Sequence, residues 1–154
     1  MHTHYDERMH SWGDAIGDAA QADLDRLLNA AIRYAQARLN EALLFEPAAL
    51  LISNDGRVLE VDQDRTGLPK HPEVEDLIRN AVLHLRQVKA ESRCTALVIN
   101  TRLPKERTDA VEVRVEHRDG VSAAVLLPYK KATFGGTTEY GELRAFVARP
   151  LVWA

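Results

Sequence analysis

The chain has 154 residues, of which 45% are hydrophobic and 28% are charged, and its formal net charge is −3. A chain of this length buries about two-thirds of its unfolded surface as one globular domain without needing a disulfide or a metal. Acidic and basic residues are interspersed and no long basic run occurs, which argues against nucleic acid or an anionic membrane as a partner.

Cysteine content and hydropathy indicate the compartment. Cys94 is the single cysteine, which rules out an internal disulfide and suits a reducing environment. The N-terminus lacks the apolar core of a signal peptide, and no apolar run approaches the ~18 residues of a membrane span. We therefore expect a cytoplasmic protein.

Residues 1–17 predict a flexible tail, because Gly13 and Gly17 interrupt any periodic pattern. Three histidines and Trp12 lie within it. The histidines offer imidazole nitrogens to a transition metal, but a glycine-flanked tail does not fix ligand geometry, so a solvated terminus is favoured over a metal site. The histidines are His2, His4 and His10. Residues 18–154 are expected to form one domain.

From about residue 18 to 43 apolar residues recur at helical spacing for some six turns. Asp18 is a suitable N-cap, and Pro47 ends the pattern before the next element. A helix of this length can lie across a sheet or against a second copy of the chain. Its apolar stripe comprises Leu24, Leu27, Leu28, Ala31, Ala35, Leu39, Ala42 and Leu43.

Residues 48–52 predict a strand that is covered on both sides, because the segment is apolar throughout. A turn at 54–56 and a returning strand at 57–61 complete a hairpin. Asp55, Asp62 and Asp64 superficially suggest calcium. They lack the twelve-residue ligand spacing and the final glutamate of a hand-type loop, so a turn and a solvated loop are predicted.

A second helix is predicted to begin with Pro72 at its first position, followed by Glu73, Glu75 and Asp76 where the helix dipole favours anions. His84 is expected at the flank in a structural or exposed position, not a catalytic one. The apolar stripe is formed by Val74, Leu77, Ile78, Ala81, Val82, Leu85 and Val88.

Residues 95–100 predict a third strand, and Cys94 before it is expected to be a small core residue because no histidine is placed beside it. After a loop at 103–109, residues 111–129 predict a hairpin with a three-residue turn at 118–120. This turn pairs His117 with Val121 and sets three valines against Ala123, Val125 and Leu127. The valines are Val111, Val113 and Val115. A two-residue turn would split the apolar set between the two faces.

Gly135-Gly136 beside Lys130 and Lys131 suggests a phosphate cradle. The segment lies between strand-like stretches and not before a helix, so a flexible loop is favoured. Residues 140–153 are compatible with a strand, a docked tail or a dimer contact. The apolar stretch 151–153 is expected to pack on the core or on a partner.

These elements predict an α+β fold in the order α-β-β-α-β-β-β, followed by an extended C-terminal segment. The fold has a five- to six-stranded antiparallel sheet and two long amphipathic helices. The element order over residues 18–129 resembles that of small roadblock and profilin-like domains, which implies helices packed against the sheet. The chain departs from roadblock proteins where Pro150 and the strand-like 140–153 replace a final helix. It is also similar to uncharacterised small bacterial proteins with the turn 116–120 and the ending 127–129, which bring no assigned activity.

Three functions remain open. The first is a non-catalytic protein-interaction module, a homodimeric regulatory or immunity-type protein, for which the polar strand face Glu112-Arg114-Glu116 is one possible contact surface. The second is a small-molecule sensor whose pocket lies between sheet and helices. Its lining would come from Tyr34, Phe45, Tyr129 or Phe134.

The third is an enzyme. Its candidate groups are His84, Cys94, His117, Glu112 and Glu116. Glu112 and Glu116 lie roughly 13 Å apart on one strand face, too far for paired glycosidase carboxylates, and His117 is expected to be exposed beside a tight turn. We therefore expect no enzyme and assign no catalytic, cofactor or metal residues. The expected partner is a second copy or another protein.

Overall fold

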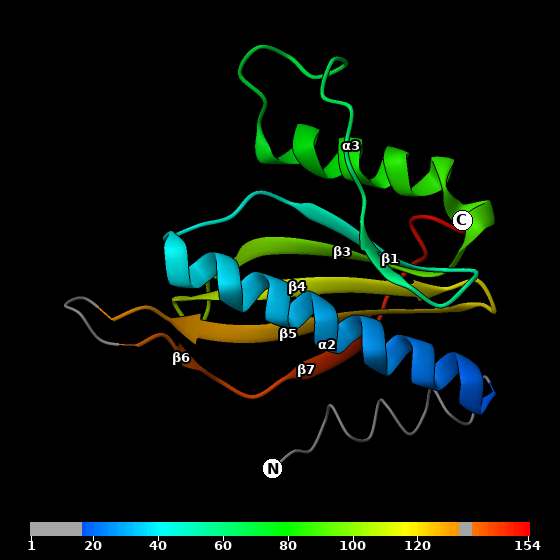
Figure 1. Ribbon diagram of the computed structural model, residues 1–154. Coiled ribbons are helices and arrows are strands. Elements are labelled where there is room, and N and C mark those ends of the chain that lie inside the picture. Colours follow the sequence, from blue (N-terminus) through cyan, green and yellow to red (C-terminus); the bar gives the residue numbers. More distant parts are fainter. Residues whose placement is uncertain (1–16, 133–136) are drawn as a thin grey trace.

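The structure is a computed structural model that describes residues 17–132 and 137–154. Figure 1 shows the elements in chain order. The predictions for residues 1–16, including the three histidines and Trp12, and for Phe134, Gly135 and Gly136 lie outside the described residues. The elements are α2 (Asp18–Glu41), β1 (Ala48–Ser53), β2 (Val58–Glu60), α3 (Val74–Gln87), a 3₁₀ turn η1 (Lys89–Glu91), β3 (Ser92–Leu103), β4 (Thr108–His117), β5 (Val121–Lys130), β6 (Glu139–Tyr140) and β7 (Arg144–Val147).

The strands form one antiparallel sheet in the order β2-β1-β3-β4-β5-β6, and β7 also pairs with β5. This confirms the predicted α+β fold and its element order. The sheet has seven strands where the sequence predicted five to six, because β6 and β7 both add to β5. β3 is also longer than the predicted strand at 95–100, since it pairs with β4 along ten successive residues.

The β4–β5 hairpin has the predicted register. His117 lies opposite Val121, and Val113 lies opposite Val125. The three β4 valines and their partners on β5 are all buried. Gly120 in the turn has φ +106°, a conformation that side-chain-bearing residues rarely adopt, and its N–H donates to the carbonyl of His117 at 2.9 Å.

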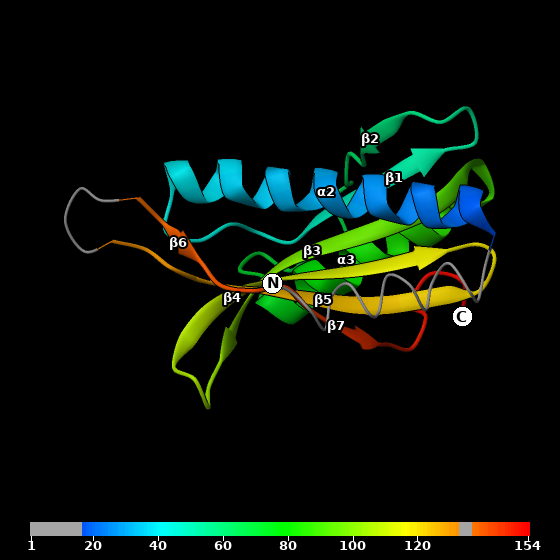
Figure 2. The ribbon, with the colours of Figure 1, turned by 90° about the horizontal axis from the view of Figure 1, so that it is seen from below.

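Helix α2 lies across one face of the sheet (Figures 1 and 2). Its buried side chains contact alternate residues of β1, β3, β4 and β5 in one large core. The helix is capped at Gly17 and ends at Glu41, so the predictions of an Asp18 cap and an end at Leu43 were wrong. Leu43 is exposed because the chain turns toward β1 at Ala42, where the Lys131 ammonium donates to the carbonyls of Leu39 and Ala42 and complements the helix dipole.

Helix α3 packs on the opposite face of β1 and β3. Ala81 and Leu85 contact Ala49, Leu97 and Ile99 in a second, smaller core. β1 is therefore covered on both sides, as its apolar sequence predicted.

The predicted start of α3 at Pro72 was wrong. The helix begins at Val74, with Glu73 as N-cap, because the Asp76 carboxylate accepts the Glu73 N–H at 2.9 Å in a capping box. Val74 is exposed and does not belong to the buried stripe.

Candidate functional site

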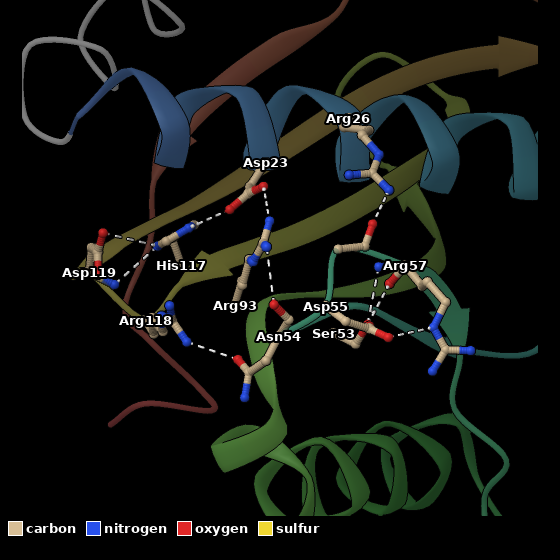
Figure 3. A network of polar contacts seen from close by, with 11 residues as sticks. Asp23, Arg26, Ser53, Asn54, Asp55, Arg57, Arg93, His117, Arg118 and Asp119 are labelled. Atoms are coloured by element: carbon tan, nitrogen blue, oxygen red, sulfur yellow. Dashed lines mark hydrogen bonds and ion pairs between the residues drawn. The ribbon is translucent and has the colours of Figure 1, made fainter.

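A network of charged side chains joins the start of α2 to the hairpin turns (Figure 3). The Asp23 carboxylate accepts from His117 Nε2 at 3.2 Å and from the Arg93 guanidinium at 3.4 Å. The Asp119 N–H donates to His117 Nδ1 at 3.1 Å. His117 is only 4% exposed, so the predicted exposure was wrong: the first turns of α2 cover it.

Arginines extend this network to the β1–β2 turn. Arg93 donates to the Asn54 carbonyl at 3.0 Å, and Arg118 donates to the Asn54 side-chain oxygen at 2.9 Å. Arg26 on α2 donates to the carbonyl of Gly56. The network therefore fastens α2 to two turns of the sheet (Figure 3).

Cys94 lies directly opposite His117 in the sheet, which brings together two of the predicted catalytic candidates. Both ring nitrogens of His117 have other partners, and Cys94 is fully buried in the α2 core. Burial, with a smaller effect of the Asp23 charge, raises the pKa of the Cys94 thiol to about 12. The thiol is thus neutral at physiological pH, as its predicted place in the core implies.

Glu116 is 3% exposed, so only part of the predicted polar strand face is available to a partner. Its carboxylate accepts three consecutive backbone N–H groups of the C-terminal segment, from Leu151 at 2.7 Å, Val152 at 3.0 Å and Trp153 at 3.1 Å. Glu112, on the same strand face, contacts Arg114 at 3.7 Å instead. The two glutamates therefore have separate structural environments.

The C-terminal segment docks on the protein core, one of the two alternatives, core or partner, that the sequence predicted for residues 151–153. Val152 is buried between α3 and the sheet beside Leu85 and Leu97. Of the three alternatives for residues 140–153, the strand and the docked tail are both realised, since β6 and β7 pair with β5 and the residues after Pro150 form a docked tail; the dimer contact stays a prediction.

His84 has a structural position. Its Nδ1 donates to the Asn80 carbonyl at 2.8 Å, and its Nε2 accepts the N–H of Asp64 at 3.0 Å. It thereby holds the loop after β2 against α3. The three aspartates that suggested calcium lie in this loop and in the preceding turn, where Asp55 contacts Arg57 and Asp64 accepts the Thr66 N–H.

A groove of about 490 Å³ lies between the C-terminal end of α2, the following linker, β2 and the first half of α3. Tyr34 and Phe45, two of the aromatic residues predicted to line a pocket, border it. Tyr129 does not: it is buried in the core, where Asn100 donates to its hydroxyl at 2.8 Å.

The groove carries more negative than positive charge. Arg38 lies over the Tyr34 ring with its central carbon 4.9 Å from the ring centroid, and Arg65 pairs with Glu46 at 2.8 Å. The Tyr34 hydroxyl donates to Glu60 at 3.3 Å, and partial burial raises the pKa of Tyr34. The four acidic lining residues are Glu41, Glu46, Glu60 and Asp62.

β7 forms an apolar edge that the sequence reading did not single out. Phe146 is 46% exposed and Val147 is 82% exposed, and among the described residues β7 pairs with β5 alone. Arg144-Ala-Phe-Val147 does not alternate, since Ala145 is buried and both Phe146 and Val147 are exposed, and four residues are too few to separate an edge strand from a docked tail.

Within residues 17–132 and 137–154, no three His, Cys, Asp or Glu side chains gather in an arrangement that suits a metal ion. The same part of the chain contains no helix with the length and apolar character required to cross a membrane.

Comparison of the chain with protein families, with curated proteins and with solved structures found no significant match. The likeness to roadblock and profilin-like domains therefore stays a prediction from element order.

Proposed function

We propose that the protein is a non-catalytic interaction module that forms a homodimer through the β7 edge. The observation that carries this proposal is the exposure of Phe146 and Val147 on a strand at the edge of the sheet. An apolar strand edge with unpaired main-chain groups is a template for pairing with another chain.

The main-chain geometry of β7 supports pairing with a second copy of itself. The N–H of Ala148 donates to the carbonyl of Ser122 at 3.2 Å, so the antiparallel alternation directs the main-chain groups of Phe146 toward β5. Those of Ala145 and Val147 then point away from the sheet. A two-fold axis at Phe146 pairs Ala145 of each copy with Val147 of the other, through four hydrogen bonds.

Side chains are complementary in the same register. The two Phe146 rings face each other across the axis, and such cross-strand aromatic pairs contribute roughly 0.2–1 kcal/mol. Because the paired strands are short, we expect dissociation at about micromolar concentration.

The non-catalytic part of the proposal rests on the predicted catalytic candidates. Cys94 and Glu116 are buried with neutral or hydrogen-bonded side chains, and His117 and His84 use both ring nitrogens in structural contacts. These arrangements supply the fold with stability and leave these groups without a substrate-facing role.

The test is the mass of the full chain by light scattering across a dilution series from about 100 μM to 0.1 μM. We expect a dimer that dissociates within this range for the wild type. Val147→Lys should be monomeric at every concentration, because pairing of the two β7 edges would remove water from the charged lysine of each copy.

Leu83→Lys is the matched control, since it replaces another exposed apolar residue, on α3 and away from the β7 edge. It should dimerise like the wild type. A wild-type chain that is monomeric at 100 μM, or a Val147→Lys chain that dimerises normally, would refute the β7 interface.

A second candidate function is small-molecule binding in the groove beside Tyr34 and Phe45. Four carboxylates line the groove, and its two arginines already have partners. This lining favours a cationic ligand with an apolar or aromatic part. A thermal-shift screen of organic amines should then find ligands that raise the melting temperature of the wild type and not of Glu60→Gln. A screen whose hits stabilise both chains equally would exclude the groove as their site.

A further inference from the structure

The C-terminal segment is held mainly by side chains that contact its main chain. After β7, the Ser122 hydroxyl donates to the carbonyl of Ala148 at 2.8 Å, and Arg114 donates to that of Arg149 at 3.3 Å. Glu116 then accepts three successive N–H groups from residues 151–153. Among the described residues, no strand pairing involves residues 149–154.

Helix α3 and η1 contact the other side of the segment. Arg86 donates to the carbonyl of Leu151 at 2.7 Å, and the Lys89 ammonium lies 3.5 Å from that of Val152. Cations therefore bind the carbonyls and one buried carboxylate binds the N–H groups. Residues 151 and 152 form a bend, which directs three consecutive N–H groups toward this one carboxylate.

Side-chain specificity in this cleft comes mainly from one position. Val152 is 3% exposed and fills the space between Ala81, Leu85 and Leu97, whereas Leu151 and Trp153 are only partly buried. The cleft thus fits a bent segment of three residues whose N–H groups bind Glu116 and whose central residue has an aliphatic side chain.

We propose that the cleft between α3 and β4 is a binding site for a short, bent apolar peptide, filled here by residues 149–153 of the same chain. Residues 149–154 of a second copy, or a free peptide of that sequence, fit the same site when the chain's own segment is out of it. The cleft uses residues of β4 and α3 and does not depend on the β7 dimer.

The experiment uses the full chain with Val152→Asp. A carboxylate cannot replace the buried valine side chain without losing its hydration, so the chain's own segment leaves the cleft. A fluorescein-labelled peptide of residues 149–154 is then titrated with this variant and followed by anisotropy. We expect saturable binding to Val152→Asp, and at least tenfold weaker binding to the wild type, because the tethered segment competes at high effective concentration.

Two further variants, made in the Val152→Asp chain, distinguish specific recognition of the peptide from nonspecific binding. Glu116→Gln should weaken peptide binding at least tenfold, because the amide has one acceptor oxygen and no charge for three N–H groups. Glu112→Gln removes the same charge from the same strand face without a contact to residues 149–153, and should bind like its parent. Absence of binding to the folded variant, or equal binding by Glu116→Gln, would overturn the proposal.

Hydrogen exchange of the wild type decides the question if Val152→Asp does not fold. The proposal expects the amides of residues 151–153 to exchange through local opening, far faster than those of Val113 and Val115 in the core. Equal protection of both sets would show that the segment leaves only when the whole domain unfolds, and would contradict an exchangeable site.

Discussion

Two neighbouring residues of β4, Glu116 and His117, are buried although both are ionisable. Burying such groups is costly unless hydrogen bonds replace the lost water. Glu116 receives three backbone N–H groups, and His117 has partners at both ring nitrogens. Each side chain therefore ties a distant segment to the hairpin: Glu116 holds the C-terminal tail and His117 holds α2.

The Cys94 thiol makes stability depend on pH in the alkaline range. Its pKa rises from 9.0 to about 12 on folding, so the folded chain keeps a proton that the unfolded chain loses. The contribution of the protonated thiol to the free energy of unfolding is fully present below pH 9. It is lost as the pH rises toward 12, by up to about 1.4 kcal/mol per pH unit.

Urea unfolding of wild type and Cys94→Ala at pH 8, 9 and 10 checks this prediction. Alanine at this position should lower the free energy of unfolding at every pH through loss of packing, but its decline above pH 9 should be the shallower of the two. Other titrating groups affect both chains alike. Parallel curves for the two chains would show that the thiol ionises without cost in the folded state.

The burial of Cys94 could be predicted from its apolar neighbours, but the burial of His117 and Glu116 could not. The Asp23 that covers His117 is 94 positions away, and the N–H groups that bind Glu116 are 35 to 37 positions away. A strand pattern specifies which way a side chain points and carries no information about which distant segment will cover it.

At the scale of elements, the β4–β5 hairpin was the most predictable part of the fold. Its valines alternate strictly, and only the three-residue turn keeps all apolar partners on one face. The ends of α2 and α3 were less predictable because they depend on contacts from elsewhere, such as Lys131 at the C-terminus of α2. β6 and β7 were too short for a periodic signal.

Gly120 provides a direct test of the hairpin turn. A side chain at φ +106° strains the backbone, and no atom lies within 4 Å of the added carbon, so the cost is conformational alone. Gly120→Ala should lower the free energy of unfolding by about 1–2 kcal/mol in urea. Gly67→Ala also adds a methyl group in open space, without a positive φ, and should change it by less than about 0.5 kcal/mol. Equal effects of the two substitutions would contradict the turn geometry.

At the scale of the whole molecule, the two helices cover opposite faces of the sheet and the strand edges remain. The β2 edge has only three residues and ends in the charged Glu60, which is how many proteins limit edge pairing. The β7 edge instead presents Phe146 and Val147. Association is therefore expected at the β7 edge.

A single cysteine at position 146 tests this assignment most directly. In the proposed register the two-fold axis passes through this position, where non-hydrogen-bonded residues have Cα atoms about 4.5 Å apart, a distance that a disulfide can span. Cys94 is buried and does not compete. Under mild oxidation Phe146→Cys should form a covalent dimer on non-reducing gels, and Leu59→Cys at the β2 edge should remain monomeric. A Phe146→Cys chain that stays uncrosslinked at 100 μM, or efficient crosslinking through Leu59→Cys, would contradict the β7 dimer.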